Sequence, residues 1–339
     1  MKAAILHDFK EPLVLEDAPV PEPGADEVLI QVEACGVCHS DLHLAEGDWS
    51  QLRGIMKRPL ILGHEVVGRI VETGSSAQGL QIGDRVGVAW IHWSCGECEI
   101  CKEGMENLCP SQIITGATVD GGYAEFIKAK ASHVVKVPDA LRSDEAAPLF
   151  CAGVTVYRAI KKAHITPGDR VAVFGIGGLG HLALQIAQAF GAELTAVDVS
   201  EEKLEFARRL GADITINATA PDTVKQIRRT GRPHTAIVTS ASKAAYDTAF
   251  AALRPGGTLA VVGLPVEPLS FAAIAMVAAE AKIIASAVGT RSDVRDVLDL
   301  AAAGKVKCEV VTRPLGQIND IFQEMREGKI PGRTVVTPP

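Results

Sequence analysis

The chain has 339 residues, which predicts two domains of ordinary size, and its 47% hydrophobic residues predict a globular protein. Its formal net charge of −7 argues against nucleic acid as a partner, because a nucleic-acid binder needs a basic surface. The longest apolar stretch, residues 269–288, contains Glu280 and Lys282 and predicts a helix followed by a buried strand, with no membrane span. The first residues carry no signal-peptide core, so we expect a cytoplasmic protein.

Residues 1–150 contain short alternating stretches that are interrupted by Gly, Pro and Asp. The predicted strands include residues 27–34, 65–74, 83–88 and 121–129. Alternation of polar and apolar residues is typical of strands that bury one face, and several such strands with turn residues between them indicate a barrel. We therefore predict a mainly-β, antiparallel barrel-like domain over residues 1–150.

From residue 170 onwards, apolar runs alternate with amphipathic segments. Helices are predicted at residues 180–191 and 201–212, and strands at 170–175, 194–199, 214–217, 235–240, 257–263 and 282–288. Near-continuous apolar strands that alternate with helices indicate a parallel sheet covered on both faces. We predict a doubly wound α/β domain over residues 151–289.

The C-terminal segment, residues 290–339, begins with a predicted helix at 291–304 and continues with short strands. We expect it to pack back on the first domain.

A glycine-rich turn joins the first predicted strand of the α/β domain to its helix. Gly175, Gly177 and Gly180 have the G-x-G-x-x-G spacing, and Asp198 ends the next strand. Glycines let the backbone approach a pyrophosphate at a helix N-terminus, and a carboxylate at the next strand end accepts ribose hydroxyls and repels a 2′-phosphate. The pattern favours NAD over NADP, and glycines that serve packing alone are the alternative.

Four cysteines, Cys95, Cys98, Cys101 and Cys109, lie close together in the sequence. Four thiolates complete a tetrahedron around one Zn²⁺ and leave no position for water or substrate, which is typical of a structural zinc site. An iron–sulfur cluster and a redox disulfide are the alternatives. We predict a structural zinc site that takes no part in the chemistry.

Further candidate ligands lie in three separate segments, residues 35–43, 62–68 and 149–159. A cysteine, a histidine and another cysteine from these segments would offer zinc three protein ligands and an open fourth position, the pattern of a catalytic site. The segments also carry a family resemblance through the motifs C-H-S-D-x-H at 38–43, G-H-E-x-x-G at 63–68, the four-cysteine lobe and GIGGLG at 175–180. In their order and spacing, over essentially the whole chain, they resemble the zinc-dependent medium-chain alcohol dehydrogenases, and bacterial and yeast-type enzymes most.

The resemblance implies a GroES-like catalytic domain, a Rossmann domain, two zinc ions per chain and NAD(H). It implies that Cys38, His64 and Cys151 bind the catalytic zinc, and that Glu65 lies behind the metal. Asp41 resembles the carboxylate that orients the histidine ligand. Cys35 is interpreted as a packing residue, and Cys308 is given no role.

The resemblance further implies hydride transfer from an alcohol to NAD, with zinc as Lewis acid and a proton path from Ser40 to His43. The same resemblance implies cofactor contacts at His39, Thr155, Gly175, Gly177, Gly178, Leu179, Gly180, Asp198, Lys203 and Arg333. For Lys203 a solvated helix position is the alternative, and for Arg333 a surface arginine.

Trp49 and Trp90 match positions that line the substrate pocket in yeast-like members, and they favour small primary or flat aromatic alcohols. The segment 50–63 is longer than those members carry and reshapes the expected entrance. A polyol or other secondary-alcohol dehydrogenase is the alternative enzyme, although that branch commonly has a carboxylate where this chain has Cys151. A non-catalytic zinc and NAD(H) sensor is the alternative from another class. The resemblance also implies a homotetramer that acts on a small alcohol or aldehyde.

Overall fold

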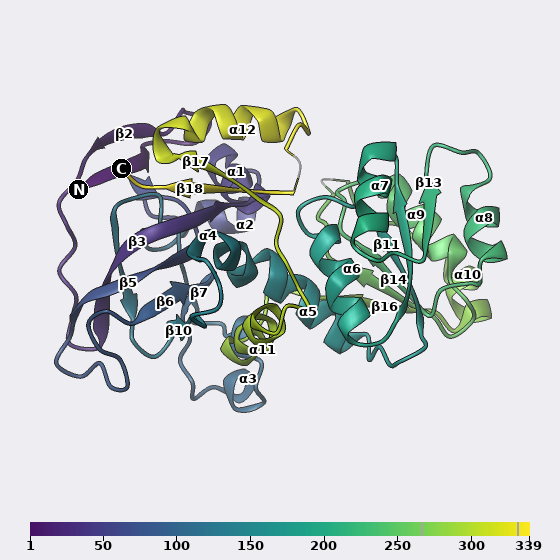
Figure 1. The fold of residues 1–339 in the computed structure, drawn as a ribbon, viewed down its shortest axis with the longest axis horizontal. Helices are drawn as coiled ribbons and strands as arrows, with labels where there is room; N and C mark the ends of the chain where they lie inside the picture. The colour runs from purple at the N-terminus through teal and green to yellow at the C-terminus, as the bar shows by residue number, and fades with distance from the viewer. Residues whose placement is uncertain (266, 331) are drawn as a thin grey trace. The chain divides into compact units, whose positions relative to one another are not determined.

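The computed structural model describes residues 1–265, 267–330 and 332–339. They form two compact units (Figure 1). The first unit comprises Met1–Ala152, Thr290–Ala302 and Cys308–Pro339, and the second comprises Gly153–Gly289 and Ala303–Lys307. The short segment 303–307, which we expected in the C-terminal part, is therefore grouped with the second unit.

The first unit is built mainly of short strands with a few helices. Before residue 90 its elements are β1 (Lys2–Leu6), β2 (Val14–Asp17), β3 (Glu27–Val37), α1 (His39–Glu46), α2 (Ser50–Arg53), β4 (Leu60–Ile61), β5 (Glu65–Thr73) and β6 (Arg85–Val88). The next are β7 (Ile91–Trp93), α3 (Glu99–Lys102), η1 (Glu106–Leu108), β8 (Ile113–Ile114), β9 (Phe126–Lys130), β10 (Val135–Lys136), α4 (Ser143–Ala146) and η2 (Ala147–Phe150). The C-terminal part adds α11 (Arg291–Ala302), β17 (Val310–Pro314), η3 (Leu315–Gln317), α12 (Ile318–Arg326) and β18 (Arg333–Thr337).

Strand β3 is the centre of the largest sheet of this unit. The sheet has the order β10-β6-β5-β3-β18-β17, and β9 also pairs with β3. Strand β3 pairs antiparallel with β5, β9 and β18, with two register shifts against β5. Register shifts bend a strand and help a sheet to curve around a core. The antiparallel prediction is thus confirmed for these pairs, whereas β17 and β18 run parallel.

Three predictions for this unit are refined by the structure. Strand β3 continues to Val37, because its last residues are buried on both faces rather than alternating. The predicted strand at 121–129 begins only at Phe126, and the residues before it bond to residues 61–63 outside a regular strand. Helix α12 was missed, although Ile318, Ile321 and Met325 recur at helical spacing and lie in the core.

The second unit is a parallel sheet with helices between its strands. Its elements are α5 (Ala152–Lys162), β11 (Arg170–Phe174), α6 (Gly180–Ala189), β12 (Glu193–Asp198), α7 (Glu201–Arg209), β13 (Ile214–Asn217), α8 (Thr223–Arg229), β14 (Thr235–Val238), α9 (Lys243–Ala252), β15 (Thr258–Val261), α10 (Ala273–Ala279) and β16 (Lys282–Ala285). The strand order is β13-β12-β11-β14-β15-β16, and every pair is parallel. This order is 3-2-1-4-5-6, so the chain reverses direction across the sheet beside β11. The doubly wound prediction is confirmed.

The apolar stretch 269–288 differs from its prediction in burial. Helix α10 has no buried residue, and its Ile274 and Val277 are 77% and 73% exposed. Strand β16 lies at the edge of the sheet and is only partly buried, so the predicted buried strand is wrong in that respect. An apolar helix beside an edge strand leaves an apolar face on the second unit.

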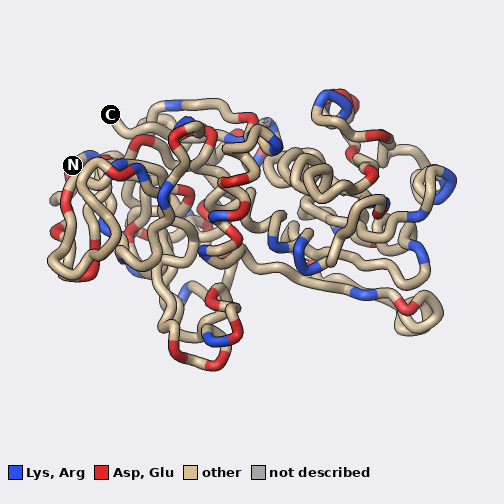
Figure 2. Tube along the Cα trace, turned by 60° about the horizontal axis from the view of Figure 1, so that its bottom comes forward, with Lys and Arg blue, Asp and Glu red and all other residues tan. Residues whose placement is uncertain are grey.

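Among the described residues, none of the helices combines the length and hydropathy that a membrane crossing requires. Acidic and basic residues are interspersed along both units (Figure 2).

Candidate functional site

Cys38 is held at the junction between β3 and α1. It is the N-cap of α1, where its Sγ accepts a hydrogen bond from the backbone N–H of Ser40 at 3.5 Å. Asp41, three residues later, accepts from the backbone N–H of Cys38 at 3.0 Å and completes a capping box. A capping box satisfies two backbone donors reciprocally and fixes the first turn of a helix. The C-H-S-D sequence thereby fixes both the thiol and the carboxylate.

The structure brings Cys38, His64, Glu65 and Cys151 together in one buried group. The Sγ atoms of Cys38 and Cys151 are 4.0 Å apart, and His64 Nε2 lies 3.2 Å from the Sγ of Cys151. Two thiols and one imidazole that converge without disulfide bonds are the donor set that zinc takes in a Cys2His site. The residues present therefore fit the metal that the sequence predicts.

The two thiols of this group differ in acidity. The hydrogen bond from Cys151 lowers the pKa of Cys38 well below its usual value, although burial opposes it. The same hydrogen bond, with burial, raises the pKa of Cys151 well above its usual value. Zinc binds the thiolate form of cysteine, so loading this site requires both sulfurs to lose their protons.

Asp41 fixes the orientation of His64. Its Oδ1 lies 2.8 Å from His64 Nδ1, and both side chains are fully buried. We infer that Nδ1 carries the proton and donates it, because a carboxylate accepts, and this leaves the Nε2 lone pair directed at Cys151.

Glu65 and Arg333 form a buried ion pair behind this group. Arg333 Nη2 donates to Glu65 Oε1, and Arg333 is only 3% exposed. Burial raises the pKa of Glu65 to about 7, although the charge of Arg333 acts in the opposite direction. Glu65 Oε2 has no hydrogen-bond partner among the described residues. The surface alternative for Arg333 is thus wrong, while its contact with cofactor phosphates stays a prediction.

Two tryptophans lie against the buried group. The ring of Trp90 is 4.9 Å from that of His64, edge to face, and 6.3 Å from that of Trp49. Trp49 also lies 5.3 Å from the ring of His43. The indoles therefore form a continuous apolar wall from the imidazole of His64 to that of His43.

The predicted proton path begins on helix α1. Ser40 and His43 are both half-buried, whereas His39 is exposed at the start of the helix. His43 Nδ1 lies 2.7 Å from Asp48 Oδ2, so the aspartate orients the ring and leaves Nε2 available as a proton acceptor.

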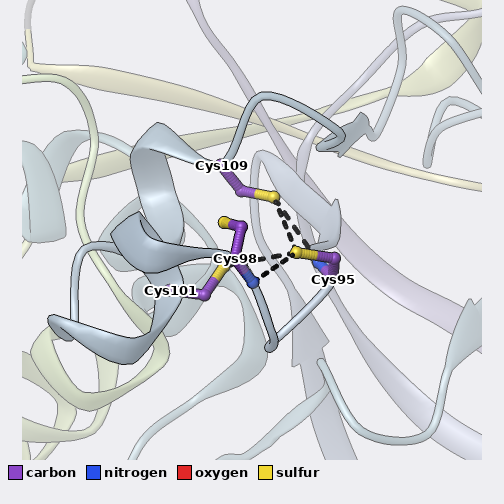
Figure 3. A group of neighbouring side chains, drawn as sticks. All are labelled: Cys95, Cys98, Cys101 and Cys109. Atoms are coloured by element: carbon purple, nitrogen blue, oxygen red, sulfur yellow. Dashed lines mark hydrogen bonds between the residues drawn. The ribbon is translucent and has the colours of Figure 1, made fainter.

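The four cysteines of the 95–109 segment gather at one place (Figure 3). The Sγ of Cys95 lies 3.6 Å from that of Cys109 and 3.9 Å from that of Cys101. The backbone N–H of Cys98 also donates to the Sγ of Cys95, and this bond lowers the pKa of Cys95 to about 6. All eight cysteines of the chain are free, which speaks against a disulfide here.

This four-cysteine lobe is tied to helix α11 by one ion pair. Both oxygens of Glu106 accept from the guanidinium of Arg291, with Nη2 2.6 Å from Oε2 and Nε 3.0 Å from each oxygen. The backbone N–H of Arg291 also donates to Glu106 at 2.7 Å. Bidentate pairs of this kind are strong and also fix the relative orientation of the two side chains.

The glycine-rich turn in the second unit follows β11. A Cβ at Gly180 would lie 1.8 Å from the carbonyl oxygen of Gly175, and Gly175 has φ of +90°, so packing explains both. A Cβ at Gly177 would meet nothing within 4 Å, and packing alone does not explain this glycine. Open space at the N-terminus of α6 fits a pyrophosphate. This observation favours the dinucleotide interpretation.

Asp198 and Lys203 lie beside this turn. Asp198 accepts from the backbone N–H groups of Ile176 at 2.6 Å and Ser200 at 3.0 Å, and is 7% exposed. Lys203 is half-buried in the first turn of α7. Gly178 and Leu179 complete the turn, and Thr155 is buried on α5.

Two family models match the chain. Residues 24–139 match the alcohol dehydrogenase GroES-like domain, and residues 178–303 match the zinc-binding dehydrogenase domain. An alcohol dehydrogenase of Geobacillus stearothermophilus is 48% identical over 337 residues, which cover 99% of each chain. The chain belongs to the zinc-dependent medium-chain alcohol dehydrogenases. The predicted family and fold class are confirmed, and the chain is an NAD-dependent oxidoreductase that acts on alcohols.

Solved structures agree with this assignment. The alcohol dehydrogenase of the archaeon Aeropyrum pernix has a TM-score of 0.91 and 38% identity, with 100% of each chain covered. Acetophenone reductase from Geotrichum candidum, solved with NAD, has a TM-score of 0.89 and 31% identity over 99% of this chain and 96% of its own. Zinc and NAD(H) as cofactors are thus confirmed for the enzyme.

Sequence reasoning missed Asp48 and Tyr123 beside the buried group, and it missed the pairing of Arg333 with Glu65. Asp48 follows a glycine in G-D-W, Arg333 was expected at a phosphate, and Tyr123 was only part of a predicted strand. The hydrogen-bond partners of Arg333 and Tyr123 lie far from them in the sequence, so no local pattern could reveal these pairs. Only Asp48 could have been found locally, because it lies five residues after its partner His43.

Proposed function

We propose that this alcohol dehydrogenase holds its catalytic zinc with Cys38, His64 and Cys151, and that it oxidises small primary and some secondary alcohols reversibly. The observation that carries the proposal is the convergence of two thiols and one imidazole in a fully buried group, with the imidazole fixed by Asp41. When bound there, zinc supplies a Lewis acid that lowers the pKa of the alcohol hydroxyl, while NAD accepts the hydride.

The protein's own residues remove the proton. Ser40 accepts it from the alcohol hydroxyl and passes it towards His43, whose ring is oriented by Asp48. Because Nδ1 of His43 faces the carboxylate, Nε2 is the nitrogen that takes up the proton. Glu65 has one oxygen without a hydrogen-bond partner beside the proposed metal ligands, and we propose that it transiently replaces a water or a ligand at the metal. Arg333 balances the charge of its carboxylate.

The two indoles support a narrow pocket. Trp90 packs edge-to-face on His64, and Trp49 extends the wall towards His43. Such a wall excludes bulky or strongly polar chains and admits small primary or flat aromatic alcohols. The same wall disfavours the polyol alternative, because a polyol needs polar partners for its further hydroxyls.

For the cofactor, we propose that Gly175, Gly177, Gly178, Leu179 and Gly180 receive the pyrophosphate, and that Asp198 and Lys203 bind the adenosine ribose. His39, Thr155 and Arg333 are the remaining proposed contacts. We expect Asp198→Gly to raise the tolerance for NADP, because the carboxylate that repels a 2′-phosphate is lost. The ratio of kcat/KM for NADP and NAD measures this, and an unchanged ratio would remove Asp198 from the ribose site.

The four-cysteine lobe holds a second, structural zinc in this proposal. The exposed apolar face of α10 and the edge strand β16 support a subunit contact, and we propose a homotetramer, which light scattering tests. Eight free cysteines support a reducing compartment, and we propose the cytoplasm.

The decisive experiment follows NADH absorbance with a panel of primary, secondary and polyhydric alcohols, before and after chelation. We expect turnover of small primary alcohols, loss of turnover on chelation, and about two zinc ions per chain, one for each ligand group. Zinc and NAD(H) binding without turnover of any alcohol would favour the sensor alternative. Preference for polyols would favour the secondary-alcohol alternative.

A further inference from the structure

Asp41 is the centre of the layer that supports the proposed zinc ligands. Its fully buried carboxylate accepts four hydrogen bonds. The donors are the backbone N–H groups of Cys38 at 3.0 Å and Gly63 at 3.2 Å, the His64 Nδ1 at 2.8 Å, and the Tyr123 hydroxyl at 2.9 Å. Of these four donors, only Tyr123 lies outside the two sequence motifs that carry Cys38 and His64.

The backbone holds Tyr123 against the segment before His64. Residues 121–123 donate hydrogen bonds to residues 61–63, among them Tyr123 N–H to the carbonyl of Leu62 at 3.0 Å. A Cβ at Gly63 would lie 2.6 Å from the Tyr123 ring, so the glycine before the histidine makes room for the aromatic ring. The hydroxyl of this enclosed ring lies 2.9 Å from Asp41 Oδ2.

The two oxygens of Asp41 have different tasks. Oδ1 faces His64 and the Gly63 N–H, whereas Oδ2 faces Tyr123 and the Cys38 N–H. Burial and the nearby charge of Asp41 raise the pKa of Tyr123 well above its usual value, so the hydroxyl keeps its proton and donates. Without it, Oδ2 would keep only the Cys38 N–H as a donor in a dry interior, and three hydrogen bonds instead of four would hold the carboxylate against His64.

We propose that Tyr123 is a positioning residue for the zinc site: its hydroxyl fixes the Asp41 carboxylate, which fixes the tautomer and ring orientation of His64. The inference rests on the proposed assignment of Cys38, His64 and Cys151 as ligands. Residues that accept a hydrogen bond from a histidine ligand influence the affinity for the metal as well as the orientation of the histidine. Tyr123 would influence the metal site through Asp41, to which its hydroxyl donates.

The test compares Tyr123→Phe with Tyr246→Phe in the full-length enzyme. Tyr246 is the matched control, because it is equally buried and donates its hydroxyl to the Gly263 carbonyl in the core of the second unit. Three readouts are measured: the rate of zinc release to a chelator, the absorption bands of the cobalt-substituted enzyme, and the melting temperature. The Phe ring keeps the packing against Gly63 in the first variant.

We expect Tyr123→Phe to release the active-site zinc about tenfold faster than wild type and to shift the cobalt bands. Tyr246→Phe should release zinc at the wild-type rate and keep the wild-type cobalt bands. Both variants should lower the melting temperature, because each loses one buried hydroxyl. Zinc release and cobalt bands equal to wild type in Tyr123→Phe would reduce Tyr123 to core packing and overturn the proposal.

A double variant tests the route through Asp41. In an Asp41→Asn background, we expect the additional Tyr123→Phe change to leave the zinc release rate unaltered, because the connection is already broken. A further tenfold increase would show that Tyr123 acts by another route. The wild-type measurement decides the ligand assignment separately: one zinc per chain, or full activity after the chelated zinc is removed, would refute that assignment whatever the tyrosine variants do.

Discussion

The two proposed metal-ligand groups of this enzyme are built in opposite ways. The lobe takes its four cysteines from one short segment, and three of the four are only half-buried. Backbone N–H groups of the same segment donate to its sulfurs. The other group takes Cys38 and Cys151 from positions 113 residues apart, leaves each only 6% exposed, and surrounds them with Asp41, Glu65 and two indoles.

The difference shows that the closeness of candidate ligands in the sequence does not indicate whether their site takes part in catalysis. Four thiolates satisfy zinc by themselves, so the lobe needs nothing beyond its own loop. Two thiolates and an imidazole leave zinc incomplete, and the surroundings must then control what enters and how it is charged. The fold supplies that control through residues from several strands and helices.

The largest expected effect comes from breaking the buried group. Cys38→Ser removes one thiolate, so the enzyme should lose its active-site zinc and fall in kcat/KM by about 10³-fold or more, since Lewis-acid catalysis is worth several kcal/mol. Metal analysis should still find about one zinc per chain, held by the lobe.

Cys35→Ala is the matched control for that variant. Cys35 is buried three residues before Cys38 but lies in the core cluster rather than in the ligand group. We expect two zinc ions and near wild-type activity. Retained zinc and activity in Cys38→Ser would contradict the assignment of the buried group.

A smaller effect on activity, with a larger effect on stability, is expected from the lobe. Cys98→Ser should remove the lobe zinc and lower the melting temperature by about 10 °C, because a structural metal contributes directly to folding. The kcat at 25 °C should stay close to wild type. Calorimetry and initial rates measure the two effects, and a loss of kcat without a loss of stability would mean that the lobe takes part in the chemistry.

Much of the fold follows from local sequence patterns. Strand β11 is a nearly continuous apolar run, and in α7 the buried Leu204 and Ala207 recur at helical spacing between charged residues. The burial of β16 was not predictable in the same way. Its apolar residues resemble those of a central strand, and only the strand order places it at the edge of the sheet.

The residues of the site also fall into those that local motifs predict and those that only the fold brings together. Cys38, His64 and the glycine turn could be predicted because each lies in a short motif of neighbouring residues that resembles the family's motifs, and in α1 those neighbours also form a capping box. The pairing of Glu65 with Arg333 joins residues 268 positions apart, and no local pattern encodes it. Long-range partners of buried charges come from topology, here from β18 beside β3.

The smallest expected effect concerns the ion pair that ties the lobe to α11. Burial by itself would raise the pKa of Glu106, but the hydrogen bonds and charge of Arg291 outweigh it and hold that pKa below its usual value of 4.5. A carboxylate with a lowered folded pKa stabilises the fold fully above its unfolded pKa, and the contribution is lost as the pH falls through the folded value. Glu106→Gln should therefore lower stability by about 1–3 kcal/mol at pH 7.

The pH dependence of the unfolding free energy distinguishes the Glu106–Arg291 pair from an ion pair at the surface. We expect denaturant unfolding curves of Glu106→Gln and wild type to converge as the pH falls through the folded pKa of Glu106, which lies below 4.5, because Glu106 then becomes protonated in the folded wild type as well. Glu205→Gln is the control: its pair with Arg208 is about half exposed, so the change should be small at every pH. A pH-independent difference for Glu106→Gln would assign the loss to packing instead of charge.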